Sequence, residues 1–276
     1  MCQLFGVSAA HPVEVNDFLL ELFIHSQIHA HGWGMAVFYG SGVNIEKEPV
    51  PAWQSNYLKS RLSDPVEVRA MIAHIRRASV GKLAYENCHP FTAKDESGRS
   101  WTLAHNGTVF HTDLIDPFHK EQRGTTDSEG ILRLLIHRMN QRLQVQDGPL
   151  SARERFALAQ QAILDLAEGN KLNLLFYDGE LLYVHTNQTD HLVYRRQGDA
   201  ILFATVPLTA GPGRACPPIS CWPIRTVSSI AGAHPTITCF RRRTRSWICT
   251  SPPCCSGRGV RYGSGKRCSG VSRTLQ

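Results

Sequence analysis

The chain lacks a continuous apolar run of the roughly 18 or more residues that a membrane-spanning helix needs. Its hydrophobic content is nevertheless 42% of 276 residues, which is enough to build a sizeable core. The first residues, Met-Cys-Gln-Leu-Phe-Gly-Val, contain neither the basic region nor the apolar region of a secretory signal. These absences predict a cytoplasmic protein without a membrane partner.

Acidic residues are absent after Asp199. Residues 210–276 carry ten arginines and one lysine, so residues 1–209 hold 19 basic against 23 acidic side chains. The net charge of +7 therefore belongs to the tail, where seven of the nine cysteines also lie. We expect residues 2–209 to form one domain. We expect residues 210–276 to be a basic tail rich in Cys, Arg and Pro that is disordered or encoded in a shifted reading frame.

Motifs for metals and nucleotides are also missing. The chain has no HExxH, no pair of CxxC motifs and neither of the common glycine-rich phosphate loops. His29 and His31, two positions apart, are the best candidates for a metal pair, but no further ligand motif accompanies them. The cysteine spacings of the tail do not match a zinc knuckle either. We therefore expect no metal ion and no cofactor.

The most informative residue is Cys2, directly behind Met1. If Met1 is removed, the thiol and a free α-amine share one residue. A thiol with an ordinary pKa of about 8.5 reacts as its thiolate, and an α-amine that titrates at about 7.7–8.0 can act as its base. A cysteine beside the start codon can also be accidental, so the catalytic interpretation depends on other motifs.

Hydrophobic periodicity predicts an order of strands, helices and strands again. Helices are expected at 13–29, at about 126–139 and at 152–168, and Thr126 with Glu129 has the form of a capping box. Strands are expected at 3–8, 33–39, 70–76, 101–105, 172–177, 181–185, 191–195 and 200–205. This order favours a single α+β domain made of stacked sheet and helix layers.

Three short motifs could carry chemistry. An amide side chain and a glycine N–H make a good oxyanion hole, and Asn106-Gly107 supplies both at the end of a predicted strand, although Asn-Gly is also a common turn. Arg76 could hold a carboxylate through its bidentate fork, or could simply be solvated at a strand end. Asp127 could bind an ammonium group, or could only cap its helix.

Together these motifs resemble those of class II glutamine amidotransferases, in which they occur in the same order. After Cys2 they are Gly32-Trp33-Gly34, His74-Ile75-Arg76, His89-Pro90-Phe91, His105-Asn106-Gly107 and Thr126-Asp127-Ser128-Glu129. The chain looks like the stand-alone members, which lack a fused synthase domain and include predicted amidotransferases and γ-glutamyl hydrolase-like relatives in thiol metabolism. The resemblance covers about residues 2–209. It implies a four-layer αββα sandwich, the N-terminal-nucleophile hydrolase fold.

The resemblance also implies a mechanism and its residues. Hydrolysis of the γ-amide of glutamine or of a γ-glutamyl compound would pass through a thioester and release ammonia or an amine. The implied roles are Cys2 as nucleophile, Asn106 and Gly107 as oxyanion hole, Arg76 for the α-carboxylate, Asp127 for the α-ammonium group and Ser79 as a hydroxyl that assists at the carboxylate. Arg77 stands where synthase-fused members often have tryptophan. Any transfer of ammonia would need a synthase partner.

Three alternatives stay open from the sequence. The first is an N-terminal-cysteine acylase that acts on another amide. The second is a nucleic-acid-binding protein that acts through the basic tail, since such tails bind phosphate backbones. We do not expect nucleic acid as a partner, because the tail has no nucleic-acid-binding motif. The third is an inactive regulatory subunit, which the presence of Cys2, Arg76, Asn106 and Asp127 disfavours.

Overall fold

The computed structural model describes residues 2–40, 42–79, 81–208, 214–215 and 220–225. Its α-helices are α1 (Asn16–Ile24), α2 (Asn56–Arg61), α3 (Asp127–Leu143) and α4 (Ala152–Ala167). Its 3₁₀ helices are η1 (His25–Gln27), η2 (Ala52–Gln54), η3 (Tyr85–Asn87) and η4 (Asp116–Glu121). Its strands are β1 (Gln3–Glu14), β2 (Trp33–Tyr39), β3 (Gly42–Glu48), β4 (Glu67–Ile75), β5 (Phe91–Lys94), β6 (Ser100–Thr108), β7 (Lys171–Tyr177), β8 (Leu181–Thr186), β9 (Val193–Gln197), β10 (Ala200–Ala204), β11 (Arg214–Ala215) and β12 (Ser220–Arg225).

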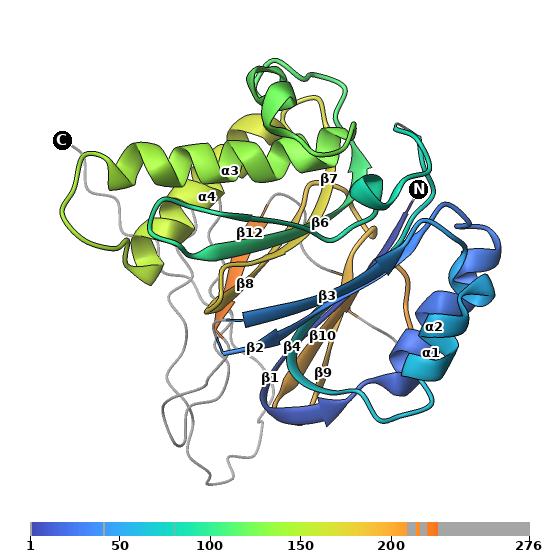
Figure 1. The fold of residues 1–276 in the computed structure, drawn as a ribbon. Helices are drawn as coiled ribbons and strands as arrows, with labels where there is room; N and C mark the ends of the chain where they lie inside the picture. Colours follow the sequence, from blue (N-terminus) through green and yellow to red (C-terminus); the bar gives the residue numbers. More distant parts are fainter. Residues whose placement is uncertain (1, 41, 80, 209–213, 216–219, 226–276) are drawn as a thin grey trace, which may run out of the picture.

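Two antiparallel sheets form the centre of the molecule. One sheet has the order β11-β9-β10-β1-β4-β2-β3, and the other has the order β12-β8-β7-β6-β5. Helices α3 and α4 lie on the outer side of the second sheet, and α1 and α2 lie on the outer side of the first (Figure 1). The order of layers is therefore helix, sheet, sheet, helix, as the expected αββα sandwich requires. No helix in the described ranges is long and apolar enough to span a bilayer.

Alternation along β1 shows how the chain fills three hydrophobic layers. Phe5 and Val7 belong to the cluster between the first sheet and its helices, whereas Leu4 belongs to the cluster between the two sheets. Gly6 also faces the second sheet, because a Cβ atom there would lie 2.8 Å from a methyl group of Leu175. Since successive side chains in a strand point to opposite faces, β1 is buried on both sides.

The two long helices begin in different ways. Ser151 and Glu154 form a complete capping box at the start of α4. Thr126 is the N-cap of α3, as expected, and accepts a hydrogen bond from the Glu129 amide. The Glu129 side chain does not return to Thr126. It accepts hydrogen bonds from the amides of Arg123 and Gly124, so it orders the loop before the helix instead.

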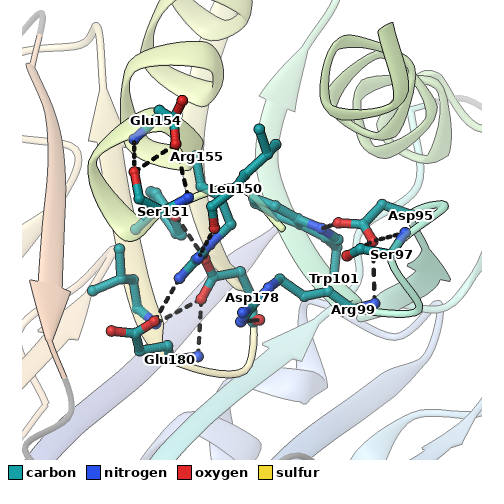
Figure 2. Close-up of polar contacts among 12 residues, drawn as sticks. Asp95, Ser97, Arg99, Trp101, Leu150, Ser151, Glu154, Arg155, Asp178 and Glu180 are labelled. Carbon is teal, nitrogen blue, oxygen red and sulfur yellow. Dashed lines mark hydrogen bonds and ion pairs between the residues drawn. The ribbon is translucent and has the colours of Figure 1, made fainter. Parts of the chain in front are cut away.

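A buried polar network lies at the end of the second sheet where β6 begins and β7 ends (Figure 2). Asn106 and Gly107 lie near the other end of these two strands. Arg155 of α4 donates to the Asp178 carboxylate over 2.6 Å, and Tyr183 donates to the same group over 2.8 Å. The second oxygen of Asp178 accepts the amides of the β7–β8 turn. Arg99, in the β5–β6 turn, donates to the Asp178 carbonyl over 2.9 Å. The network thus joins two hairpin turns to one helix.

The structure differs from the sequence-based expectations at several elements. β1 continues to Glu14, where Val13 pairs with Val68, so the predicted helix at 13–29 begins only at Asn16 and becomes a 3₁₀ turn at His25. Strands β3 and β5 and helix α2 were not predicted. In the basic segment, β11 pairs with β9 and β12 pairs with β8, although we expected that segment to stay outside the fold. Its remaining residues lie outside the described ranges, so the domain boundary at 209 stays a prediction.

Candidate active site

Cys2 immediately precedes β1, and its thiol is partly buried against the segment that follows β4. The Arg77 amide donates to Sγ over 3.3 Å. The thiol in turn donates to the Arg77 carbonyl oxygen over 3.6 Å. The two segments meet because Gln3 pairs with Ile75 in the β1–β4 ladder. Burial raises the pKa of the thiol above its ordinary value. The Arg77 hydrogen bond and the Arg76 charge lower this pKa, whereas the Asp127 charge raises it.

Arg76 directly follows β4, and its side chain is buried. Its amide donates to the Gly32 carbonyl oxygen over 2.8 Å, and this hydrogen bond fixes the backbone at Arg76. Its guanidinium donates to the carbonyl of Lys82 over 3.0 Å and to that of Gly81 at 3.4 Å. The loop that follows β4 therefore turns back and fixes the position of the guanidinium.

Asp127 is the first residue of α3. One carboxylate oxygen accepts the Val109 amide over 2.9 Å, and the other accepts the Ser128 amide over 2.9 Å. Val109 lies two positions after Gly107, so the carboxylate is tied to the chain that leaves the Asn-Gly motif. Capping of the helix is the task of Thr126 and not of Asp127.

Asn106 and Gly107 lie near the end of β6, where they pair with Asn173 and Leu172 of β7. The Asn106 side chain is buried, and its Oδ1 atom has no hydrogen-bond partner among the described residues. A Cβ atom at Gly107 would lie 1.8 Å from the Lys171 carbonyl oxygen. Glycine is therefore required here by the close approach of β7, independently of any substrate.

The strand alternation brings most of the candidate residues to one place. Leu4 and Ala104 belong to the cluster between the sheets, so Cys2 and Asn106, each two positions away, fall on these facing sides. β1 and β6 are in contact across the two sheets. Arg76 directly precedes Arg77, whose amide donates to Sγ of Cys2, and Asp127 accepts the amide of Val109, two positions after Gly107. The charges of Arg76 and Asp127 shift the pKa of the Cys2 thiol in opposite directions.

Ser79 is not part of this group in the structure. It lies exposed in the loop after β4, and no contact of its hydroxyl links it to the other candidates within the described ranges. Arg77 contributes backbone groups to the thiol, while its side chain is exposed. His31, which we had considered only as a metal ligand, accepts the Ala78 amide over 2.8 Å. It thereby supports the backbone of the segment after β4, which contacts the Cys2 thiol.

Three buried histidines lie beneath the site. His74 stacks on His89 with ring centroids 4.1 Å apart, and His89 Nδ1 accepts the His105 amide over 3.1 Å. His105 bridges Ser128 at 2.9 Å and the Lys171 carbonyl at 3.1 Å, so its Nε2 carries the proton. Burial lowers the pKa of all three rings and keeps them neutral.

Comparison with known proteins identifies the family of the chain. The family model of the class-II glutamine amidotransferases matches residues 1–202. A putative glutamine amidotransferase of Escherichia coli, YafJ, is 31% identical over 199 residues, which are 71% of this chain and 77% of YafJ.

Solved structures share the fold. A predicted glutamine amidotransferase of Pseudomonas aeruginosa aligns with a TM-score of 0.59 and 21% identity over 80% of this chain and 96% of its own. The glutamine phosphoribosylpyrophosphate amidotransferase of B. subtilis aligns with a TM-score of 0.63 and 17% identity, over 88% of this chain and 50% of its own. The chain therefore belongs to the class II glutamine amidotransferases and has the N-terminal-nucleophile hydrolase fold.

Proposed function

We propose that this protein hydrolyses the γ-amide of glutamine, or of a γ-glutamyl compound, with Cys2 as its nucleophile. The observation that supports the proposal is a pair of contacts: the amide of Arg77, next to Arg76, donates to the Cys2 thiol, and Asp127 accepts the amide of Val109, two positions after Gly107. Arg76 and Asp127 both act electrostatically on Cys2, and together they match the two ends of an α-amino acid. A substrate held between them would present its side-chain amide to the sulfur.

The reaction has two stages. Cys2 loses its thiol proton to its own α-amine, directly or through water, once Met1 has been removed. The thiolate forms a bond to the γ-carbonyl carbon, and the oxygen becomes an oxyanion that the Asn106 side-chain amide and the Gly107 N–H stabilise. The C–N bond then breaks, and the nitrogen takes the proton and leaves as ammonia or an amine. Water cleaves the thioester, which gives glutamate and the free thiol.

Arg76 and Asp127 take no part in bond making under this proposal. They position the substrate, because an oriented ground state lowers the entropic part of the barrier. Ser79 assists at the carboxylate only if its exposed loop moves toward the substrate. The chain spans half of the B. subtilis amidotransferase. We assign glutamate release to this protein, and we propose that any transfer of ammonia takes place with a synthase partner.

The test is glutamate release by the purified protein from glutamine and from a set of γ-glutamyl peptides. Cys2→Ala should lower kcat/KM by more than about a thousandfold. Cys88→Ala is the matched control. Cys88 is the other cysteine whose side chain the structure describes, and it is buried, with a pKa raised to about 11 by burial. Equal activity of wild type and Cys2→Ala, or no glutamate release by wild type from any of these compounds, would refute the proposal.

A further inference from the structure

Asn87 lies between the two charged residues of the proposed substrate clamp. It ends η3, in the loop between β4 and β5, and its side chain is buried. Its Nδ2 atom donates to the Lys82 carbonyl over 3.0 Å. The same carbonyl accepts the Arg76 guanidinium over 3.0 Å. The position of this one oxygen atom therefore depends on both side chains.

The other hydrogen bonds of Asn87 reach the segment that leads to Asp127. Its Oδ1 accepts a hydrogen bond from the Thr125 amide over 2.8 Å. Its Nδ2 donates to the Thr125 hydroxyl oxygen over 3.1 Å. Thr125 immediately precedes Thr126, which caps α3, and Asp127 is the next residue. A shift of Thr125 would therefore move the Asp127 carboxylate.

Glycines allow the two loops to meet at Asn87. A Cβ atom at Gly124 would lie 2.3 Å from Oδ1 of Asn87, and one at Gly81 would lie 3.1 Å from its Nδ2. Gly81 also has a φ of +81°, a conformation that other residues rarely adopt. The loop with Arg76 extends from the first sheet, whereas α3 covers the second sheet. Asn87 thus joins parts of the molecule that belong to different layers.

We propose that Asn87 is a positioning residue that sets the spacing between Arg76 and Asp127, and so selects substrates that carry both an α-carboxylate and an α-ammonium group. This inference rests on the proposed function of these two charges. One amide group can do this because it has two donor hydrogens and an acceptor oxygen, and the contacts above use both kinds. A purely structural asparagine would affect stability without affecting which end of the substrate is recognised.

The test compares three substrates: glutamine, glutamine α-amide, which lacks the α-carboxylate, and N-acetylglutamine, which lacks the α-ammonium group. Wild type should prefer glutamine strongly over both analogues. In Asn87→Ala the KM for glutamine should rise about tenfold or more while kcat changes little, because ground-state and transition-state binding are lost together. The kcat/KM of the analogues should change less, so the preference for glutamine shrinks.

A second variant separates the two ends of the clamp. Asn87→Asp keeps an oxygen for the Thr125 amide but places a carboxylate against the Lys82 carbonyl. Its preference for glutamine over the α-amide should therefore shrink more than its preference over N-acetylglutamine. Asn87→Asp also carries the test if Asn87→Ala cannot be purified in a folded form.

The control is Asn16→Ala. Asn16 donates to the carbonyls of Leu62 and Asp64 and accepts the Val66 amide, so it makes a similar set of bonds at the opposite end of β1 and β4. It should lower stability and leave both substrate preferences unchanged. Unchanged preferences in both Asn87 variants, with an active wild type, would overturn this inference alone. No hydrolysis by wild type would overturn the proposed function beneath it.

Discussion

At the scale of single residues, the Cys2 thiol experiences opposing influences. Burial raises its pKa, and the hydrogen bond from the Arg77 amide lowers it. The nearby charges act in opposite directions, since Arg76 lowers the pKa and Asp127 raises it. The proposed substrate clamp therefore also influences the nucleophile, and this provides a test of proximity that needs no substrate.

We expect Arg76→Gln to raise the pKa of the Cys2 thiol and Asp127→Asn to lower it. The measurement is the pH dependence of alkylation by iodoacetamide, followed on the Cys2 peptide by mass spectrometry so that other thiols do not interfere. Asp165→Asn, on the exposed face of α4, is the control and should leave the midpoint unchanged. Shifts in the same direction for both variants would contradict the assigned geometry.

Gly107 gives a second residue-scale prediction. A Cβ atom there would overlap the Lys171 carbonyl, so Gly107→Ala must displace β6 from β7 and move the proposed oxyanion donor. We expect glutamate release to fall by about a hundredfold or more, together with a lower melting temperature. Gly42→Ala is the control, because its nearest neighbour would be 3.4 Å away. A kcat of Gly107→Ala equal to that of the wild type would exclude the Gly107 N–H from the oxyanion hole.

The sequence motifs identified several candidate residues of the site. They did not reveal the contacts that hold these residues in place. Gly107 was expected to supply an N–H group to an oxyanion hole. The structure also requires glycine there for the close approach of β7, and strand pairing cannot be known from one strand alone. His31 was considered only as a metal ligand, although it accepts a backbone amide. Asn87 carried one signal, its position two residues before the His-Pro-Phe motif. Its partners come from distant segments that local patterns do not connect.

At the scale of elements, the two sheets meet over the histidine cluster formed by His74, His89 and His105. Burial lowers the pKa of each ring in the folded state below the ordinary value of 6.5. The unfolded chain therefore binds more protons than the folded chain when the pH falls below about 6.5. Their contribution to stability is complete above this pH, and it is lost as the pH falls toward the lowered folded-state values.

We expect the free energy of unfolding to be flat between about pH 7 and 8 and to decrease between about pH 6.5 and 5. The slope can approach about 4 kcal/mol per pH unit if all three rings gain protons only on unfolding. Urea unfolding at a series of pH values measures it, and His74→Gln should reduce the slope by about a third. A slope independent of the histidines would contradict their neutral, buried state.

The network at the other end of the second sheet predicts a different effect. Arg155→Met leaves the buried Asp178 carboxylate without its ion pair, and we expect a loss of about 3–5 kcal/mol of stability. Because this network lies at the opposite end of β6 and β7 from the candidate site, the KM for glutamine should stay at its wild-type value. Arg153→Met, an exposed arginine on the same helix, is the control. A raised KM in Arg155→Met would show that the two ends are coupled.

Elements were predictable where one pattern dominated. The buried strand β4 and helix α3 have clear apolar periodicity, and both were expected at nearly their observed places. Strand β3 was missed because its sequence, Gly-Val-Asn-Ile-Glu-Lys-Glu, is largely polar, as suits its position at a sheet edge. At Val13–Val15 the apolar spacing fits a helix, but pairing with β4 extends the strand through Glu14.

At the scale of the whole molecule, the candidate site is assembled from both sheets and from the start of α3. The order of short motifs along the chain indicated the family, and through the family the four-layer fold. Composition indicated a boundary near residue 209. The pairing of β12 with β8 was not predictable, because the Cys-, Pro- and Arg-rich segment has no clear strand pattern of its own.

A truncation tests the role of the basic segment. A chain that ends at Arg225 keeps β11 and β12, and we expect its kcat/KM for glutamine to stay within about twofold of the full chain, since every proposed site residue precedes this point. A chain that ends at Leu208 exposes the edges of β8 and β9 and should melt at a lower temperature. Loss of activity in the chain that ends at Arg225 would assign a function to residues 226–276.

The central claim is that Cys2 carries the γ-glutamyl group during turnover, and one measurement tests it most directly. Wild-type protein that is turning over glutamine is quenched in acid, digested and mapped by mass spectrometry. We expect a glutamyl group on an N-terminal peptide that begins at Cys2, labile to hydroxylamine as a thioester is, and absent from Cys2→Ala. Steady glutamate release with no adduct on Cys2, or from a chain that retains Met1, would contradict the account.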